Sequence, residues 1–464
     1  MRYPSFACAL VLVVLAGCSD DQGPCDPADG SGCDDGQVCE VVSGGEPACF
    51  APVFITGRVF DLADDDPVAG ARLVALDGNG APAGLVAVSA ADGGYAIRVP
   101  TARSAEGAPL DRGAVTLRAD AAGYVSFPAG VRPALPIATA APVVEDGRYV
   151  IRSPLTDVAL LPLAGAPTGQ LHGVVATNAT HAPTLVVAEN AALPGAVKGR
   201  TAIADGDGDY RIFNLPAGSY TITAYAAGHS YQTRTVTVGD GADVGADLAL
   251  DDGATASLAG SIQIVNPQQG VATSVILVVE STFDPALVRG ETPAGLRAPG
   301  PGHLPDVTGG FQIEGVPAGR YVVLAAFEND HLVRDASSIG GTGIVHQPIT
   351  AGQAVTLADS FKVTGAVDLV GPGANGPEVV TGTPTFRWVD DSSEDRYRVS
   401  VFDAYGTMVW EHLEPSGARD PSTVYAGPPL RPGMTYQFRV VSIKDPNEEL
   451  SRSEDLRGVF TIAR

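Results

Sequence analysis

Positive charge is scarce in this 464-residue sequence, which has 29 Lys and Arg residues against 53 Asp and Glu and a formal net charge of −24. A chain this acidic repels the phosphates of nucleic acids, which excludes them as partners. Beyond the N-terminus no run of about 18 consecutive apolar residues occurs, so we expect no transmembrane helix. Charged residues make up only 18% of the chain and hydrophobic residues 45%, which argues against a disordered chain and against a coiled coil.

Residues that carry catalytic chemistry are also few. The seven histidines form no H-E-x-x-H motif, and the sequence has no G-x-S-x-G nucleophile elbow. A G-x-G-x-x-G match from Gly371 to Gly376 runs into Pro377 rather than into a helix, so it lacks the geometry that cradles a phosphate. We therefore predict a chain that is not an enzyme and has neither catalytic residues nor a cofactor.

The N-terminus has the pattern of an export signal. Arg2 precedes an apolar run of signal-peptide length, which ends in Leu15-Ala16-Gly17-Cys18. These four residues resemble the bacterial lipobox. The resemblance implies that residues 1–17 are removed and that Cys18 becomes the lipid-bearing first residue, which attaches the chain to a membrane. An ordinary secretory signal is the alternative. Ser19 resembles an outer-membrane retention signal, which implies an envelope protein anchored in the outer membrane.

The remaining cysteines lie together in residues 18–52, and none follows them. Cys25, Cys33, Cys39 and Cys49 are an even set in a Gly- and Asp-rich stretch with almost no hydrophobic residues. Such a stretch cannot build a core, so we predict two disulfides, of which three pairings are open. A zinc site is disfavoured because the spacings contain no C-x-x-C pair and no histidine is near.

The rest of the chain, with 56 Gly and 36 Pro in the whole sequence, shows short alternating runs typical of all-β sandwiches. One unit recurs at intervals of about 100 residues, the size of one sandwich. Each copy has a Gly turn followed by a strand in which an aromatic residue and Ile share one face, and the second and third copies continue into a Pro-Ala-Gly corner and a returning strand. The three units begin their motifs at Gly93, Gly208 and Gly309.

The copies resemble the carboxypeptidase regulatory-like domain family, whose fold is a transthyretin-like β-sandwich. The second copy carries the motif best, through Asp207, Tyr210, Leu215, Gly218 and Tyr220. The first replaces the corner by a longer loop, and the third has an insertion from Ser281 to Asp306. We predict tandem all-β, Ig-like or transthyretin-like sandwiches over residues 53–164, 165–252 and 253–364.

The last segment, residues 365–464, has a different pattern. Trp388 lies on an alternating strand, and Leu430 and Tyr436 belong to an L-x-P-x-x-x-Y turn. These positions resemble a fibronectin type III domain, in which the tryptophan packs in the core and the tyrosine hydroxyl bonds back to the turn.

Two groups of residues are weak candidates for ligand binding. Asp205, Asp207 and Asp209 alternate with glycine and offer oxygens of the kind calcium prefers, although a hairpin turn demands the same residues. Four aromatic residues lie at strand ends or at positions that alternate away from the predicted core, and they are candidates for exposure and sugar stacking: Tyr225, Tyr231, Tyr405 and Trp410. For Trp410, partial burial is the expectation.

We predict a non-catalytic envelope lipoprotein whose sandwiches act as spacer and binding surface. The fold's kinship with carbohydrate-binding modules makes polysaccharide one ligand class, and an envelope protein is the other. The alternatives are purely structural spacing and an accessory subunit of a hydrolase, or an unusual extracytoplasmic hydrolase. The last would use the insertion, where Asp284-Pro285 could start a short helix near Glu291, His303 and Asp306.

Overall fold

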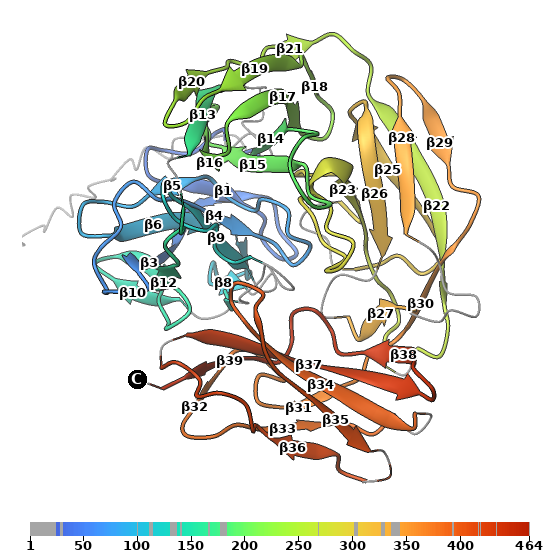
Figure 1. The fold of residues 1–464 in the computed structure, drawn as a ribbon. Coiled ribbons are helices and arrows are strands. Elements are labelled where there is room, and N and C mark those ends of the chain that lie inside the picture. The colour runs from blue at the N-terminus through green and yellow to red at the C-terminus, as the bar shows by residue number, and fades with distance from the viewer. Residues whose placement is uncertain are drawn as a thin grey trace, which may run out of the picture.

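The computed structural model describes most of the chain from Cys25 to Ala463, and the described ranges are 25–27, 31–99, 101–110, 115–129, 137–139, 142–165, 168–176, 183–267, 269–300, 305–325, 330–335, 344–391, 394–415, 417, 419–432 and 434–463. The expected signal peptide and Cys18 lie outside them, so lipidation stays a prediction. The described residues form β-strands and one 3-10 turn, η1, Glu280–Thr282 (Figure 1). The predicted all-β class, with tandem sandwiches after a disulfide-rich segment, is confirmed. No helix in the described ranges is long and apolar enough to span a membrane.

The N-terminal disulfide segment is a small hairpin tied by two bonds. β1 (Val38–Glu40) pairs antiparallel with β2 (Ala48–Phe50). Of the three pairings left open by the sequence, the structure has Cys25–Cys39 and Cys33–Cys49. These two disulfides hold the segment in a defined structure, because it has too few apolar residues to build a core.

Sandwich 1 is built around its long first strand, β3. This strand pairs antiparallel with β6 and parallel with β11 and β12, and β4 is the centre of the second sheet, β5-β4-β9. The strands are β3 (Val53–Asp61), β4 (Arg72–Leu76), β5 (Ala87–Val88), β6 (Gly94–Val99), β7 (Ala102–Arg103), β8 (Pro109–Leu110), β9 (Thr116–Asp120), β10 (Val143–Glu145), β11 (Arg148–Ile151) and β12 (Val158–Leu160).

Sandwich 2 has the same plan with fewer additions. Its sheets are β16-β13-β20 and β15-β14-β17-β19, with a small β18-β21 pair. The strands are β13 (Gly169–Val174), β14 (Thr184–Glu189), β15 (Gly199–Ala204), β16 (Asp209–Leu215), β17 (Gly218–Tyr225), β18 (Ser230–Tyr231), β19 (Arg234–Val238), β20 (Asp243–Gly245) and β21 (Leu250–Asp251).

Sandwich 3 has the same plan as sandwiches 1 and 2. Its sheets are β25-β22-β30-β27, with β29 also on β22, and β24-β23-β26-β28. The strands are β22 (Ala256–Ile264), β23 (Val275–Val279), β24 (Arg297–Ala298), β25 (Gly310–Val316), β26 (Gly319–Ala325), β27 (Leu332–Arg334), β28 (Val345–Ile349), β29 (Ala354–Thr356) and β30 (Phe361–Gly365).

Sandwich 4 packs a three-stranded sheet, β31-β33-β36, on a six-stranded one ordered β32-β39-β37-β34-β35 with β38 on β37. Trp388 is buried in its core, and the backbone N–H of Arg431 donates to the Tyr436 hydroxyl at 2.8 Å. The strands are β31 (Leu369–Gly371), β32 (Glu378–Val380), β33 (Thr385–Trp388), β34 (Arg396–Asp403), β35 (Met408–Pro415), β36 (Ser422–Val424), β37 (Thr435–Lys444), β38 (Glu448–Arg452) and β39 (Val459–Ile462).

One glycine–tyrosine pair explains part of the repeated motif. In sandwich 2, a Cβ on Gly173 would lie 2.4 Å from the carbonyl oxygen of Ala246, and the buried hydroxyl of Tyr210 donates to that same oxygen at 2.5 Å. Sandwich 1 has the same arrangement, in which Tyr95 donates to Thr156 beside Gly57. The opening glycine is therefore required because a neighbouring carbonyl approaches where a side chain would stand.

The Pro-Ala-Gly corner does not make the hairpin that the sequence predicts. The strand before it, β16, pairs with β13, whereas the strand after it, β17, pairs with β14 and β19 in the other sheet. β25 and β26 of sandwich 3 divide between sheets in the same way. The corner therefore carries the chain from one sheet to the other across the core.

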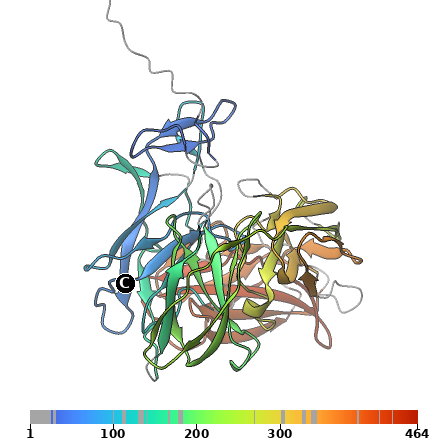
Figure 2. The same cartoon turned by 90° about the horizontal axis from the view of Figure 1, so that it is seen from above.

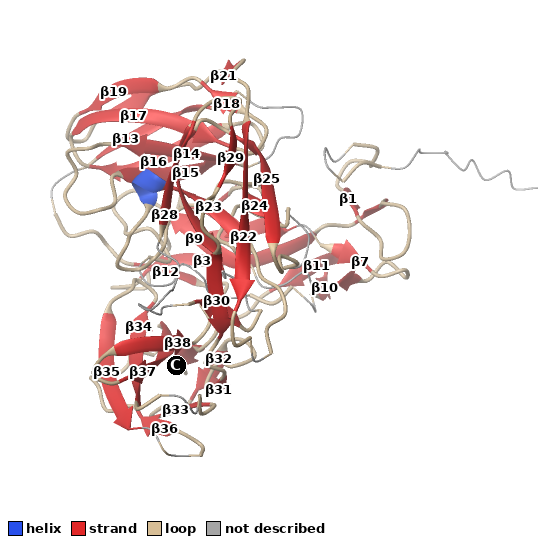
Figure 3. Cartoon of the chain, turned by 90° about the vertical axis from the view of Figure 1, so that its right-hand side faces the viewer, coloured by secondary structure: helices blue, strands red, loops and turns tan. Residues whose placement is uncertain are grey.

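The four sandwiches are arranged in cyclic order rather than in a row. Figure 1 shows sandwich 1 at the left, sandwich 2 at the top, sandwich 3 at the right and sandwich 4 at the bottom. One hydrophobic cluster joins the cores of sandwiches 1 and 4, and a second joins residues of sandwiches 1, 2 and 3. The disulfide segment and the adjoining end of sandwich 1 project from this arrangement (Figures 2 and 3).

Candidate functional site: the junctions between the sandwiches

Residues at the same repeat position join sandwich 1 to sandwich 2 and sandwich 2 to sandwich 3. Asn214, at a bulge in β16 with φ of 60°, inserts its side chain into the Ala121–Tyr124 turn of sandwich 1. Its amide donates to the carbonyls of Ala121 at 2.9 Å and Tyr124 at 2.8 Å and accepts the N–H of Gly123 at 2.8 Å. These three bonds satisfy the polar groups of the turn at the junction.

Gly315 holds the matching position in sandwich 3. It too lies at a bulge, with φ of 68°, and its carbonyl accepts the N–H of Gly228 in the Ala-Ala-Gly-His turn of sandwich 2 at 2.7 Å. A Cβ on Gly315 would lie 2.6 Å from that nitrogen. In sandwich 1, the first sandwich among the described residues, β6 pairs with β3 without a bulge. The bulge is thus found in the two copies that dock on a predecessor.

A buried arginine joins sandwiches 1, 2 and 3 at one point. Arg118 on β9 lies 2.7 Å from Asp120 and 2.9 Å from Glu291 of sandwich 3, and it donates to both Thr201 oxygens of sandwich 2 at 3.0 Å. Its side chain is 8% exposed. Burial alone would lower the pKa of Arg118, but the carboxylates of Asp120 and Glu291 outweigh it and raise that pKa.

A second buried pair fastens a turn of sandwich 1 to sandwich 3. Arg297 on β24 lies 2.8 Å from Asp77, and the hydroxyl of Ser274 donates to the side chain of Asn79 at 3.0 Å. Burial raises the pKa of Asp77 above its ordinary value even though Arg297 opposes this. The insertion of sandwich 3, which contains β24, therefore serves as an interface element.

Sandwich 4 closes the arrangement by contacting both sandwich 3 and sandwich 1. Asp455 lies 2.6 Å from Arg289 of sandwich 3 and 2.5 Å from Arg439. Toward sandwich 1, the Tyr405 hydroxyl donates to Ala159 and accepts the N–H of Leu161 at 3.0 Å. Burial is the largest cause that lowers the pKa of Arg439, to about 10.

The disulfide segment is joined to sandwich 1 by a buried ion pair. Glu40, next to Cys39, lies 2.5 Å from Arg103, and its other oxygen accepts two hydrogen bonds from Thr101 at 3.0 Å. The Arg103 guanidinium also lies over the rings of Phe50 and Tyr149, 4.7 and 5.1 Å from their centroids. Such a pair fixes the segment's direction because breaking it would leave a buried charge without a partner.

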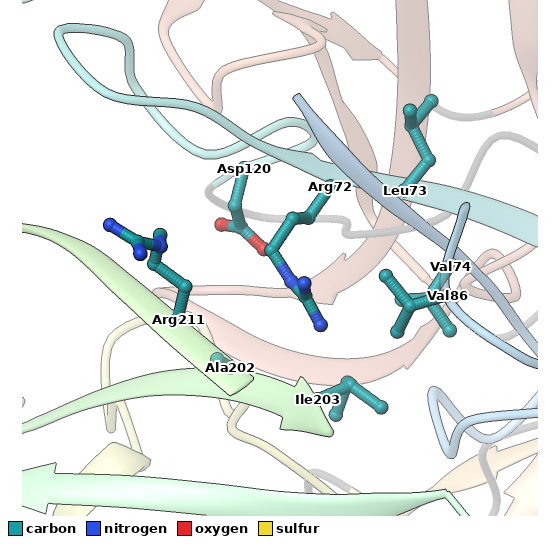
Figure 4. Close-up of a pocket in the computed structure, with 8 residues that line it drawn as sticks. All are labelled: Arg72, Leu73, Val74, Val86, Asp120, Ala202, Ile203 and Arg211. Carbon is teal, nitrogen blue, oxygen red and sulfur yellow. The ribbon is translucent and has the colours of Figure 1, made fainter. Parts of the chain in front are cut away.

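The pocket in Figure 4 lies on the seam between sandwiches 1 and 2. The space inside it that can hold the centre of a water-sized sphere is only about 10 Å³, which is room for about one water molecule and far below the roughly 300–1,000 Å³ of ordinary small-molecule sites. Arg72 at its wall lies 3.3 Å from Asp205, and Arg211 lies 3.2 Å from Asp243. The polar groups around this pocket thus serve the junction and the neighbouring turns.

The Asp205–Asp209 candidate for calcium is a turn that contacts sandwich 1. One carboxylate oxygen of Asp205 accepts the N–H groups of Asp207 and Asp209, and the other faces Arg72. Among the described residues, the acidic, His or Cys side chains that gather at metal-binding distance are Cys25, Cys33 and Cys39, which the disulfides occupy. The three aspartates do not form such a group.

The expected exposure of three aromatic candidates is wrong. Tyr225 and Tyr231 are buried, and Tyr225 packs edge-on against Tyr321 of sandwich 3 with ring centroids 6.1 Å apart. Tyr405 is half-buried at the junction with sandwich 1. Trp410 is half-buried against Phe386 and Tyr425, as the packing alternative expects. Neighbouring sandwiches cover Tyr225 and Tyr405, whereas Tyr231 belongs to the core of sandwich 2 itself.

Two described residues of the hydrolase alternative have separate partners. Glu291 serves the Arg118 junction, and Asp284 accepts the N–H of Ala286 at 2.9 Å in a tight turn, where the hydrolase alternative placed the start of a short helix. His303 lies outside the described residues, and Asp306 is exposed.

Sequence reasoning missed the junctions themselves. One signal was available, because Asn214 and Gly315 occupy the same repeat position and are the two residue types that adopt positive φ most readily. The ion pairs carry no such signal, because Arg118 and Glu291 are 173 residues apart.

These features define a tandem β-sandwich protein whose modules are locked together. Residues 170–251, which cover most of sandwich 2, match the carboxypeptidase regulatory-like domain family, as the resemblance of this copy predicted. No curated protein matches the chain.

Solved structures of pilins are similar to the chain at low scores. GBS52, the minor pilin in the Gram-positive pathogen Streptococcus agalactiae, is 12% identical over 44% of this chain and 99% of its own, with a TM-score of 0.19. A streptococcal ancillary pilin is 12% identical over 67% and 98%, with a TM-score of 0.17. The shaft pilin SpaA from Lactobacillus rhamnosus GG is 11% identical over 43% and 96%, with a TM-score of 0.17. These scores carry no argument about function.

Proposed function

We propose that this chain is a non-catalytic bacterial envelope lipoprotein whose sandwiches form one rigid scaffold. The observation that carries the proposal is that the most buried arginines among the described residues join different segments of the chain. Arg118, Arg297 and Arg103 each bond to a different segment of the chain instead of lining a cleft. Locked modules suit a protein that presents a fixed surface, and a linear spacer would not need these contacts.

The anchor and the finer family assignments belong to the same proposal. Cys18 bears the lipid, and the protein resides in the outer membrane. Sandwiches 1 and 3 are further carboxypeptidase regulatory-like domains, which the glycine–tyrosine pair shared by sandwiches 1 and 2 and the bulge shared by sandwiches 2 and 3 support. Sandwich 4 is a fibronectin type III-like domain, supported by buried Trp388 and the Tyr436 corner.

The ligand is a polysaccharide or an envelope protein, bound by loops at the ends of the sandwiches. Loops are favoured because they vary without disturbing the core that the strands build. Tyr225 and Tyr231 are withdrawn as sugar platforms, since both rings are buried.

Cys18→Ser tests the anchor. We expect the wild-type N-terminal peptide to carry acyl chains by mass spectrometry and the protein to fractionate with membranes, whereas C18S is released in soluble form. Cys8→Ser is the matched control, because Cys8 lies within the expected signal peptide, and it should behave as wild type. An unacylated wild-type peptide would refute the anchor.

Glycan-array binding by the whole folded chain tests the ligand class. Reproducible binding to a polysaccharide family supports that class. An array without hits, together with co-purification of a specific envelope protein after cross-linking, would instead establish the protein partner.

A further inference from the structure

An apolar strand edge lies in the same projecting part of the molecule as the disulfide segment, in which the described chain begins (Figure 3). β10 pairs with β11 and with no other described strand, and its Val143 and Val144 are 58% and 66% exposed. Consecutive strand residues point to opposite faces, so β10 presents apolar surface on both sides. Val41, in the disulfide segment, is 41% exposed.

This edge is firmly connected to the disulfide segment. Val144 lies opposite Tyr149 in the β10–β11 pairing, and the Arg103 guanidinium lies over the Tyr149 ring. Arg103 in turn holds Glu40, the neighbour of Cys39. In Figure 3, β1, β7, β10 and β11 all belong to the projecting part of the molecule. The hairpin therefore keeps a fixed position relative to Cys25.

The length of chain before Cys25 sets how far this part can be from a membrane. Six residues lie between Cys18 and Cys25, and the seven Cα–Cα steps from one to the other span at most about 25 Å. If Cys18 is acylated, as the proposed function states, Cys25 must stay within that distance of the lipid surface.

We propose that the β10 edge, formed by Val143 and Val144, rests on the surface of the lipid layer that holds the anchor. The partner is a zwitterionic phospholipid headgroup layer. The charges of the hairpin favour this choice: the Arg152 guanidinium lies 3.8 Å from Glu145, and Asp146 and Arg148 occupy its turn, so the tip has no net positive charge to seek anionic lipid. Tethering makes the contact intramolecular, so a weak apolar contact suffices.

Hydrogen exchange on vesicles tests this contact. We expect the amides of residues 143–150 to exchange at least threefold more slowly in the acylated protein on phosphatidylcholine vesicles than in a chain that starts at Ser19 and is free in solution. The double variant V143S/V144S should lose the difference. Val379→Ser is the matched control, because Val379 is also an exposed strand valine, in β32, and it should retain the difference.

Three results would overturn the inference. They are equal exchange in the tethered and free chains, protection that survives in V143S/V144S, and stronger protection on phosphatidylglycerol vesicles, which would indicate an electrostatic contact. Acylation of the N-terminal peptide is measured in the same samples. An acylated but unprotected protein refutes this inference alone, whereas an unacylated one refutes the proposed anchor.

Discussion

Buried tyrosine hydroxyls recur at corresponding positions of the repeats. Tyr220 donates to the carbonyl of Pro216 at 2.7 Å, and Tyr321 donates to that of Pro317 at 2.9 Å, four residues before it in each case. Each hydroxyl thus secures the corner between two sheets with a hydrogen bond worth about 1 kcal/mol. The aromatic positions that the alternating pattern assigned to the core are all buried: Tyr95, Tyr210, Tyr220, Phe311 and Tyr321.

Alkaline pH should weaken the fold through these hydroxyls. Burial, assisted by Asp247, raises the pKa of Tyr210 to about 12. A group whose pKa is raised on folding gives its full stabilisation below its unfolded value, near pH 10, and loses it as the pH rises toward 12. We expect the free energy of unfolding to fall over this window, by up to about 2–3 kcal/mol for Tyr210.

Tyr210→Phe provides the comparison. Denaturant unfolding of both proteins at pH 9 and pH 11.5 should show a smaller loss for Y210F, because the other ionisable groups contribute equally to the two. The same loss in both proteins would contradict the assignment. Absorbance at 295 nm should show fewer tyrosines that titrate above pH 11 in the variant.

At the scale of elements, the repeated bulge decides how neighbouring sandwiches dock. Gly315→Ala adds a Cβ 2.6 Å from the nitrogen of Gly228 and forces an L residue into positive φ. We expect a loss of about 3 kcal/mol, of which roughly 1 kcal/mol comes from the backbone conformation. Urea unfolding measures this loss.

Gly241→Ala separates the two causes. Gly241 has φ of 67° and open space where its Cβ would stand, so its substitution carries the backbone cost without the clash. Equal losses in G241A and G315A would show that the junction between sandwiches 2 and 3 does not depend on this contact.

The sequence predicted local features well and distant ones poorly. The alternation of apolar and polar residues placed Tyr210 and Ile212 on the buried face of β16, because the sequence of a single strand shows which of its residues share a face. The sequence predicted that the strands on either side of the Pro-Ala-Gly corner pair with each other, but they belong to different sheets. A corner that joins two sheets has the same residue types as a hairpin turn. The number of cysteines predicted two disulfides, but which cysteines pair is known only from the structure.

The candidate site was the least predictable part. The segment around Asp205 has the composition of a calcium-binding loop, yet the Asp205 carboxylate pairs with Arg72, which is 133 residues away in the sequence. Exposure of Tyr225 was inferred for an isolated sandwich, and the ring of Tyr321 from the next sandwich covers it. Residues at an interface between modules look like surface residues until both modules are placed.

At the scale of the whole molecule, shared cores predict cooperative unfolding. Sandwiches 1 and 4 contribute to one hydrophobic cluster, and Arg118 ties sandwiches 1, 2 and 3. We expect a single calorimetric transition for wild type. Arg118→Met leaves buried acceptors without their partner, which costs about 3–5 kcal/mol, and should split that transition.

Arg320→Met is the matched control, because Arg320 is an exposed arginine paired with Glu280, and it should leave the transition single. Several independent transitions in wild type would refute the coupling. X-ray scattering gives a second measure, since a compact chain of this length has a radius of gyration of about 22 Å, far below that of four sandwiches in a line.

The core shared by the first and last sandwiches also sets the order of events during biosynthesis. Ribosomes deliver a chain N-terminus first, so Phe127 and its neighbours emerge hundreds of residues before Tyr405, which packs against Phe127 with ring centroids 6.0 Å apart. A nascent polypeptide halted near residue 364 would therefore display apolar surface that only the missing end can cover. We therefore expect such a fragment to be a better substrate for chaperones and proteases than the full chain, because sandwich 4 is needed to complete the core of sandwich 1.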